Sequence, residues 1–152
     1  MTEEELKNKL ALQFENASFD QSGQWLNMTL TADEWLTAAT FLRHFEDAPF
    51  DYLFCLTCID WKTKLTMVYH LSSTLTRNNI VVKVDLDRSK PEIESVSAIW
   101  RTAEFHEREV YELFGVNFLN HPDLRLLILP IGWEGRNPLR KDFEDPVNMI
   151  KL

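Results

Sequence analysis

The chain of 152 residues has few cysteines, few glycines and no excess of basic residues. Its four glycines form no G-x-G-x-x-G or P-loop pattern, and no serine stands in a G-x-S-x-G context, so neither a phosphate-binding loop nor a nucleophile elbow is predicted. Sixteen Lys and Arg against twenty-four Asp and Glu give a net charge of −8, which disfavours broad binding to nucleic acid or anionic lipid.

The sequence also lacks a long apolar run. No stretch approaches the roughly 20 residues that cross a bilayer, and residues 1–9 are acidic and polar where a secretory signal would be basic and then apolar. We therefore expect a soluble, cytoplasmic chain.

The only two cysteines, Cys55 and Cys58, stand in "FDYLFCLTCIDW". A redox CxxC motif normally opens a helix, and a structural zinc site needs two further ligands. The surrounding residues instead predict a buried strand, on which a spacing of three points the side chains to opposite faces. We interpret both as reduced cysteines in apolar packing. No H-x-x-x-H or H-x-H pair occurs, so no metal site is predicted.

Hydrophobic periodicity predicts a helix, a strand, a second helix and then a group of strands. Possible capping boxes at Thr2–Glu5 and Thr31–Glu34 begin helices of about residues 2–14 and 32–45. Apolar alternation and turn-like connections predict strands at about residues 25–31, 51–60, 65–71 and 80–86.

The second half begins with Pro91, which suits the first turn of a short helix. A longer helix over "TAEFHEREVYELFG" ends at Gly115, and "LRLLIL", residues 124–129, predicts another apolar strand or a buried extended segment. This order favours a single α+β domain, residues 1–130, with a mixed β-sheet packed by helices. An extended C-terminal tail, residues 131–152, follows.

Charged residues gather in the longer helix. Arg108 stands four residues from both Glu104 and Glu112, which predicts an exposed ion-pair ladder contributing about 0.2–0.5 kcal/mol per pair. Glu107, Arg108 and Glu109 could instead include a general acid, but a solvated charged face is the commoner explanation.

Two further segments have distinctive composition. His121-Pro122-Asp123 predicts a turn in which the aspartate bonds nearby amides. The tail sequence "WEGRNPLRKDF" sets basic residues beside Trp133, Leu139 and Phe143, and Arg and Trp are enriched in protein interfaces. This predicts an interaction tail, with a disordered tail as the alternative.

The run "EREVYELFGVNFLNHPDLR" resembles the signature of the C-type subunit of NADH:quinone oxidoreductase, the 30 kDa subunit family of respiratory complex I, which related hydrogenase complexes share. The resemblance extends through "SVSAIWRTAEFHERE" and "WEGRNPLRKDF", about residues 95–143. The sequence departs from the family pattern twice. Leu126 stands where a second basic residue usually follows Arg125, and Arg136-Asn137 replaces a single histidine.

The resemblance implies an α+β subunit with no active site and no cofactor of its own, because FMN, iron–sulfur clusters and quinone belong to other subunits. Implied partners are the D-type subunit that helps form the quinone site and neighbouring iron–sulfur subunits, at the cytoplasmic face of the inner membrane, with no nucleic acid. The residues implied at interfaces or in the signature are Glu107, Arg108, Glu109, Gly115, His121, Pro122, Asp123, Leu124, Arg125, Trp133, Glu134, Gly135, Arg140, Lys141 and Asp142.

Three functions follow as hypotheses. The resemblance favours a structural subunit of a proton-translocating NADH:quinone oxidoreductase, with the tail against the quinone-site subunit and Trp133 as an apolar anchor. The two departures support an alternative, an equivalent scaffold subunit of a membrane-bound hydrogenase or another quinone-reducing dehydrogenase complex. A free-standing thiol or metal enzyme that uses Cys55 and Cys58 with a histidine is the third hypothesis.

Overall fold

The computed structural model describes residues 1–148 of the protein. Along the chain it contains α1 (Glu3–Gln13), β1 (Ser18–Asp20), β2 (Leu26–Leu30), α2 (Ala32–Arg43), β3 (Tyr52–Asp60), β4 (Leu65–Ser72), β5 (Asn79–Leu86), β6 (Glu92–Glu94), α3 (Ala103–Phe114) and β7 (Asn117–Leu119).

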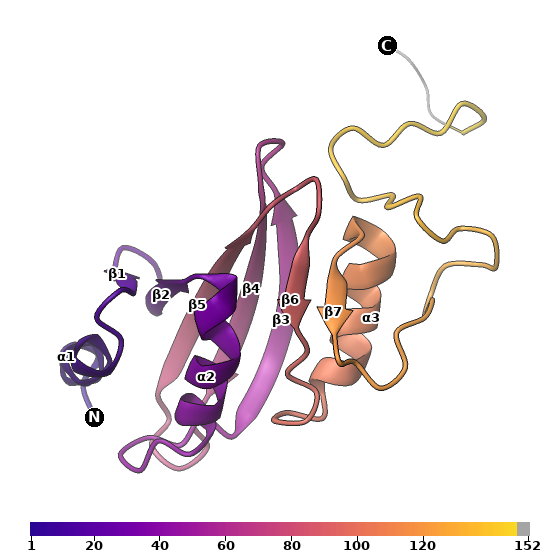
Figure 1. The fold of residues 1–152 in the computed structure, drawn as a ribbon. Coiled ribbons are helices and arrows are strands. Elements are labelled where there is room, and N and C mark those ends of the chain that lie inside the picture. The colour runs from indigo at the N-terminus through magenta and orange to yellow at the C-terminus, as the bar shows by residue number, and fades with distance from the viewer. Residues whose placement is uncertain (149–152) are drawn as a thin grey trace.

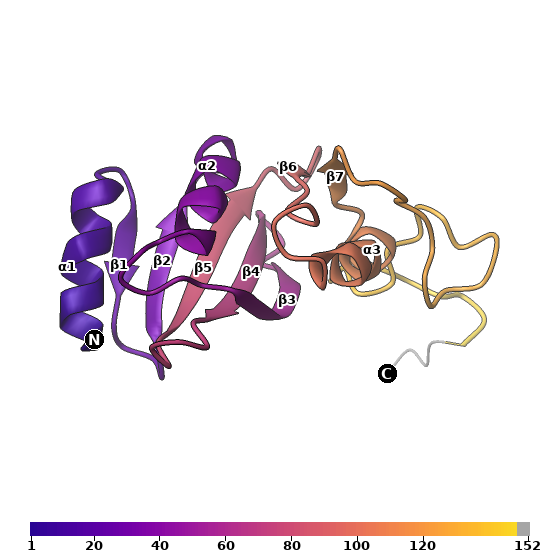
Figure 2. The ribbon, with the colours of Figure 1, turned by 90° about the horizontal axis from the view of Figure 1, so that it is seen from below.

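Five strands form a mixed sheet in the order β1-β2-β5-β4-β3, and β6 pairs with β7 in a small parallel sheet. Strand β2 runs parallel to β5, whereas the other neighbours in the large sheet are antiparallel. Helix α1 lies beside β1 at one end of the molecule, and α3 lies beyond β3 at the other (Figure 1, Figure 2). The predicted single α+β domain with a mixed sheet is confirmed.

The core lies between the large sheet and its helices. Leu26, Met28 and Leu30 of β2 alternate with half-buried residues, which is the period-two pattern of a strand with one face in the core. Helix α2 packs into the same core through Trp35 and Leu42, both without solvent exposure. Burying a side chain of this size contributes about 1.5–3 kcal/mol relative to leaving it exposed.

The two predicted capping boxes differ in outcome. The Thr2 hydroxyl accepts a hydrogen bond from the Glu5 amide at 3.2 Å, and the Glu5 carboxylate accepts one from the Thr2 amide at 3.0 Å, so this box is confirmed. At the start of α2 the box prediction is wrong. The Thr31 hydroxyl donates to the Glu34 carboxylate at 2.8 Å and caps no amide with its side chain.

The predicted short helix after Pro91 is also wrong. Residues Glu92–Glu94 form β6, because β7 supplies backbone partners on both sides of it: the Asn117 amide donates to the Pro91 carbonyl and the Ser95 amide to the Leu119 carbonyl, each at 2.9 Å. Between them Ile93 is buried. A pairing between segments this far apart in the chain leaves no local sequence signal.

The chain from residue 120 to residue 148 has no helix or strand. It extends beyond α3, at the end of the molecule opposite α1 (Figure 1). Within residues 1–148, none of the helices combines the length and apolar character needed to span a bilayer.

Candidate functional site

The charged residues of α3 turn toward the protein rather than toward solvent. Glu107, Arg108 and Glu112 are all buried, at 0%, 5% and 1% exposure, so the predicted solvated face is wrong for these three. The predicted ion-pair ladder is wrong as well. Arg108 donates from Nε to the Arg125 carbonyl at 3.1 Å and from a terminal guanidinium nitrogen to the Leu126 carbonyl at 2.6 Å.

Glu112 binds the continuation of the same loop. Its carboxylate accepts hydrogen bonds from the amides of Leu127 at 2.8 Å, Ile128 at 2.9 Å and Leu129 at 3.2 Å. Charge-assisted bonds of this kind are about twice as strong as neutral ones. Arg108 and Glu112 therefore give the loop the backbone partners that a neighbouring strand would otherwise supply.

This loop, residues 124–130, corrects the prediction for "LRLLIL". It is neither a strand nor a buried segment, since its backbone is bound by the two helix side chains and part of its apolar surface faces solvent. Ile128 is 68% exposed, and the adjacent Ile131 is 98% exposed. The structure thus holds an apolar loop at the surface by means of buried charges.

Glu107 lies deeper than its two charged neighbours on the helix. Its carboxylate accepts from the Ser95 hydroxyl at 2.6 Å and from the Val96 amide at 2.8 Å, and His121 Nε2 lies 3.8 Å away. Burial raises the pKa of Glu107 to about 7, although these two hydrogen bonds act to lower it. Glu109, by contrast, is half-buried.

The segment His121–Arg125 forms an irregular turn, although its bonds differ from those predicted. The Asp123 amide donates to His121 Nδ1 at 3.0 Å, and His121 Nε2 lies 2.9 Å from the Glu104 carbonyl. These contacts select the tautomer with the proton on Nε2. The Asp123 carboxylate pairs with Arg125 at 2.9 Å instead of bonding amides, while Pro122 is exposed and Leu124 half-buried.

Gly115 ends α3 in the left-handed conformation, with φ of 78°, as its predicted place at the helix end requires. A Cβ atom at this position would lie 2.6 Å from Asn137 Nδ2. The Asn137 side chain therefore packs on the glycine, at one of the two positions where the sequence departs from the family pattern.

The tail supplies hydrogen-bond donors to the carbonyls at the C-terminal end of α3. Arg140 Nε donates to the Phe114 carbonyl at 2.7 Å, and the Leu139 amide donates to the Leu113 carbonyl at 3.1 Å. A basic side chain at a helix C-terminus also interacts favourably with the helix dipole. Arg140 thus binds its own chain.

Asp60, at the end of β3, fixes the next part of the tail. Its carboxylate forms a bidentate pair with Arg88 at 2.8 and 2.9 Å and accepts from the Lys141 amide at 2.8 Å. Arg88 also reaches Asp142 at 2.9 Å. The Arg88 guanidinium and these amide bonds hold the pKa of Asp60 well below its usual range. Sequence reasoning missed both Asp60 and Arg88, whose only signal is an isolated charge beside an apolar strand.

The outer part of the tail carries exposed and half-exposed groups. The Arg136 guanidinium lies 4.7 Å from the ring of Trp133, whose centroid is 6.3 Å from that of Phe143. Glu134 accepts from the Gly132 amide at 3.0 Å, and Gly135 has φ of 79°. The Lys141 side chain is exposed.

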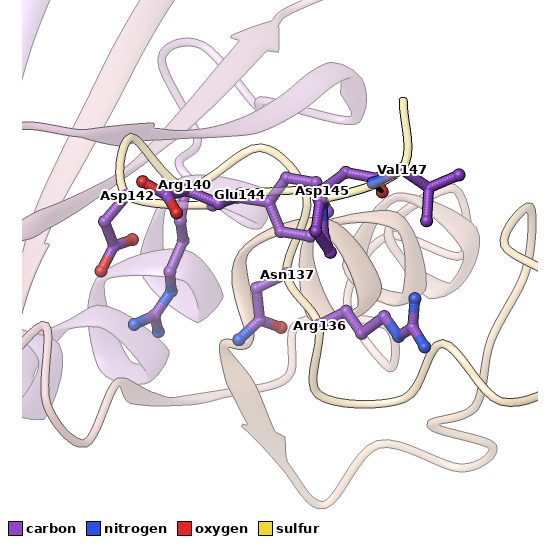
Figure 3. Close-up of a pocket in the computed structure, with 9 residues that line it drawn as sticks. Arg136, Asn137, Arg140, Asp142, Glu144, Asp145 and Val147 are labelled. Atoms are coloured by element: carbon purple, nitrogen blue, oxygen red, sulfur yellow. Dashed lines mark hydrogen bonds between the residues drawn. The ribbon is translucent and has the colours of Figure 1, made fainter. Parts of the chain in front are cut away.

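A hollow of about 650 Å³ lies within the tail, lined by Arg136, Asn137, Arg140, Asp142, Phe143, Glu144, Asp145, Pro146 and Val147. In Figure 3, Arg136 and Arg140 lie on different sides of Asn137. With Arg140 and Asp142 engaged in bonds to the domain, this lining stabilises the tail and presents no nucleophile beside a general base.

The two cysteines are free and point to opposite faces of β3, since Cys55 pairs with His70 across the sheet and Cys58 with the core residue Met67. Burial raises the pKa of Cys58 to about 12 and that of Cys55 above its ordinary value. Thiols of this kind are poor nucleophiles at neutral pH. Within the described residues, no three His, Cys, Asp or Glu side chains are grouped to hold a metal ion.

Residues 28–147 match the family described as "Respiratory-chain NADH dehydrogenase, 30 Kd subunit". A C/D-type subunit of the NADH-quinone oxidoreductase of Phocaeicola vulgatus is 49% identical over 104 residues, which cover 67% of this chain and 20% of that protein. A C-type subunit of the NADH-quinone oxidoreductase of Chlorobium phaeobacteroides is 41% identical over 118 residues, 76% of this chain and 70% of the relative. The chain thus spans about a fifth of the first relative and most of the second.

Two solved structures share the fold. A chain described as "Nqo5 of the trypsin-resistant fragment (1-134)" aligns with a TM-score of 0.71 at 24% identity, over 81% of this chain and all of that one. A chain of the "membrane-bound sulfane sulfur reductase (MBS), an archaeal respiratory membrane complex" aligns with a TM-score of 0.78 at 28% identity, over 93% of this chain and 85% of that one.

Proposed function

Because this chain belongs to the 30 kDa subunit family of the respiratory-chain NADH dehydrogenase, we propose that it is a structural subunit in the peripheral arm of a proton-translocating NADH:quinone oxidoreductase. It has no active site of its own. It braces the quinone-site subunit, while other subunits carry FMN, iron–sulfur clusters and quinone, and it meets the cytoplasmic face of the inner membrane through the complex.

The observation that carries this proposal is the use made of the charged residues of α3. A general acid or base must reach the proton it transfers. Arg108 and Glu112 instead bind the backbone of residues 125–129, and Ile128 of that loop is exposed, as is Ile131 just after it. Rigid, preorganised apolar groups lower the entropic cost of binding a partner. This arrangement suits recognition better than chemistry.

The partner that we propose for this surface is the D-type, quinone-site subunit. Support comes from the relative in Phocaeicola vulgatus, whose name combines the C and D types in one chain, and covalent fusion suits two domains that lie side by side. In our proposal the loop of residues 124–130, with its exposed Ile128, and the exposed Ile131 that follows it meet the quinone-site subunit. Neighbouring iron–sulfur subunits contact the rest of this end of the molecule.

Residues 131–152 form the partner-binding tail of this proposal, although residues 149–152 lie outside the described part. Arg140 and Asp142 are bound to their own domain and orient the tail, so the direct contacts are assigned to Trp133 and the exposed Lys141 side chain. Apolar anchors such as Trp dominate the energetics of many interfaces.

A second candidate keeps the scaffold role in a different complex. The chain from the membrane-bound sulfane sulfur reductase covers 93% of this chain with a TM-score of 0.78, and its description names a respiratory membrane complex with a different activity. Identification of the catalytic subunits that co-purify separates the two candidates, since an NADH-oxidising flavin subunit is expected only in the first. A partner without it, such as a hydrogenase-type subunit with four nickel-ligating cysteines, would favour the second.

The test is deletion of the gene, followed by complementation with the wild-type protein, Ile128→Asp or Leu12→Asp. Leu12 is 84% exposed on α1, at the far end of the molecule, and serves as the matched control. We expect deletion to abolish assembly of the quinone-reducing arm, Ile128→Asp to reduce the assembled complex, and Leu12→Asp to restore it. A fully active complex assembled without this chain would contradict the proposal.

A further inference from the structure

Glu107 is a fully buried carboxyl group that the proposed function does not use. Its side chain extends from α3 toward the segment after β6 and the turn that contains His121. Among residues 1–148, His121 is the only side chain able to carry a positive charge within 4 Å of the carboxylate. Arg108, its neighbour in sequence, is turned to the loop carbonyls. A buried carboxylate without a cationic partner is costly, so this site favours the neutral acid.

The groups that face Glu107 from the surrounding elements add little positive charge. His121 Nδ1 accepts a hydrogen bond from the Asp123 amide at 3.0 Å, so this ring nitrogen carries no proton in this arrangement. Glu104, one turn earlier on α3, is itself acidic and disfavours a second negative charge. Tyr69 on β4 is fully buried, and burial raises its pKa well above the ordinary value, so its hydroxyl stays neutral.

Two serine hydroxyls connect the buried carboxyl to a half-buried position. Ser95 Oγ lies 2.6 Å from Glu107 Oε2 and 2.8 Å from Ser97 Oγ, and either serine can be the donor in the second contact. Ser95 is buried and Ser97 is half-buried. Each hydroxyl can reverse its hydrogen bond without movement of the backbone.

We propose that Glu107, Ser95 and Ser97 form a proton-binding site, in which the carboxyl group holds the proton and the two hydroxyls exchange it with solvent. In the protonated state Glu107 donates to Ser95, which donates to Ser97. On release, Ser97 gives a proton to water, takes one from Ser95, and Ser95 takes the proton of Glu107. Both hydroxyls then point toward the carboxylate, so that atoms and charge balance.

Proton release leaves a negative charge in the interior, between α3 and the segment that follows β6. The folded state then loses stability as pH rises. The pKa of Glu107 is about 7 in the folded chain against an ordinary 4.5. The stabilisation from the proton bound to Glu107 is therefore complete below pH 4.5 and is lost as pH rises from 4.5 to about 7. Within that window the folding constant drops by about tenfold per pH unit for this one proton.

The test is a pH titration of the glutamate side-chain carboxyl carbons in the full chain by NMR, with Glu107→Gln to assign the Glu107 signal. We expect a midpoint near 7. Ser95→Ala should raise it further, because the carboxylate loses a donor. Ser97→Ala should leave the midpoint in place and slow proton exchange. Ser89→Ala, whose hydroxyl binds the exposed Asp87, is the matched control and should change neither.

A midpoint below about 5, in the ordinary range of glutamate, would overturn the proposal. If Glu107→Gln fails to fold, the Ser95→Ala shift still tests it, since a purely structural serine would leave the titration unchanged. Unfolding of the wild-type chain by urea between pH 5 and pH 8 is the second readout, and a folding constant that does not fall with pH would also refute the site.

Discussion

Replacement of Glu112 by alanine should release the apolar loop from α3. Glu112 is 1% exposed, and its carboxylate accepts from the amides of Leu127, Ile128 and Leu129. Hydrogen bonds to charged groups contribute about 1.5–3 kcal/mol each, but the freed amides lie near the surface and regain water, which offsets part of the loss. We therefore expect the free energy of unfolding to fall by about 3–5 kcal/mol, at the upper end for a single substitution.

The measurement is urea denaturation of the full chain together with amide hydrogen exchange. Glu112→Ala should speed exchange at residues 127–129, which separates a released loop from general destabilisation. Glu109→Ala, a half-buried carboxylate on the same helix, is the control and should cost less than about 1 kcal/mol. Unchanged exchange at these amides, with a loss of stability below about 1 kcal/mol, would refute the view that Glu112 holds the loop.

Three further predictions concern the tail and the thiols. Asp60→Asn removes the buried one of the two acidic partners of Arg88, and we expect faster tryptic cleavage within the tail. In the wild type the stabilisation from the depressed pKa of Asp60 is present above about pH 4 and is lost as pH falls, and a tail insensitive to acid would contradict this. Gly115→Ala should destabilise by more than about 1 kcal/mol, because of positive φ and the Asn137 contact, as thermal unfolding can measure. Cys58, with a pKa of about 12, should resist alkylation in the folded chain at pH 8, and rapid labelling there would show that the thiol is accessible as thiolate.

Local sequence patterns were sufficient to predict most of the helices and strands of the fold. Alternating apolar residues predicted β2, apolar segments between short polar connections predicted β3, β4 and β5, and the glycine at the end of a periodic helix predicted the helix end. β1 was missed because it is only three residues long and pairs with β2 across a turn. Such signals reside in neighbouring residues, which is why they can be read without the structure.

The site depended on contacts that local patterns do not encode. A spacing of four residues between Arg108 and Glu112 suits a mutual ion pair as well as two separate bonds to one loop, and only the folded loop decides between them. The run "LRLLIL" has the composition of a strand, but its backbone partners are side chains. The Lys141 amide donates a hydrogen bond to Asp60, 81 residues earlier, and the sequence around neither residue predicts that contact.

The central claim is that this chain acts within a respiratory complex as a structural subunit. Affinity purification of the protein, tagged at Met1, from its own membranes in mild detergent tests this most directly, with partners identified by mass spectrometry and the eluate assayed for NADH:quinone activity. We predict flavin and iron–sulfur subunits, the quinone-site subunit and activity in the eluate. A protein recovered alone, without partners or activity, would contradict the account.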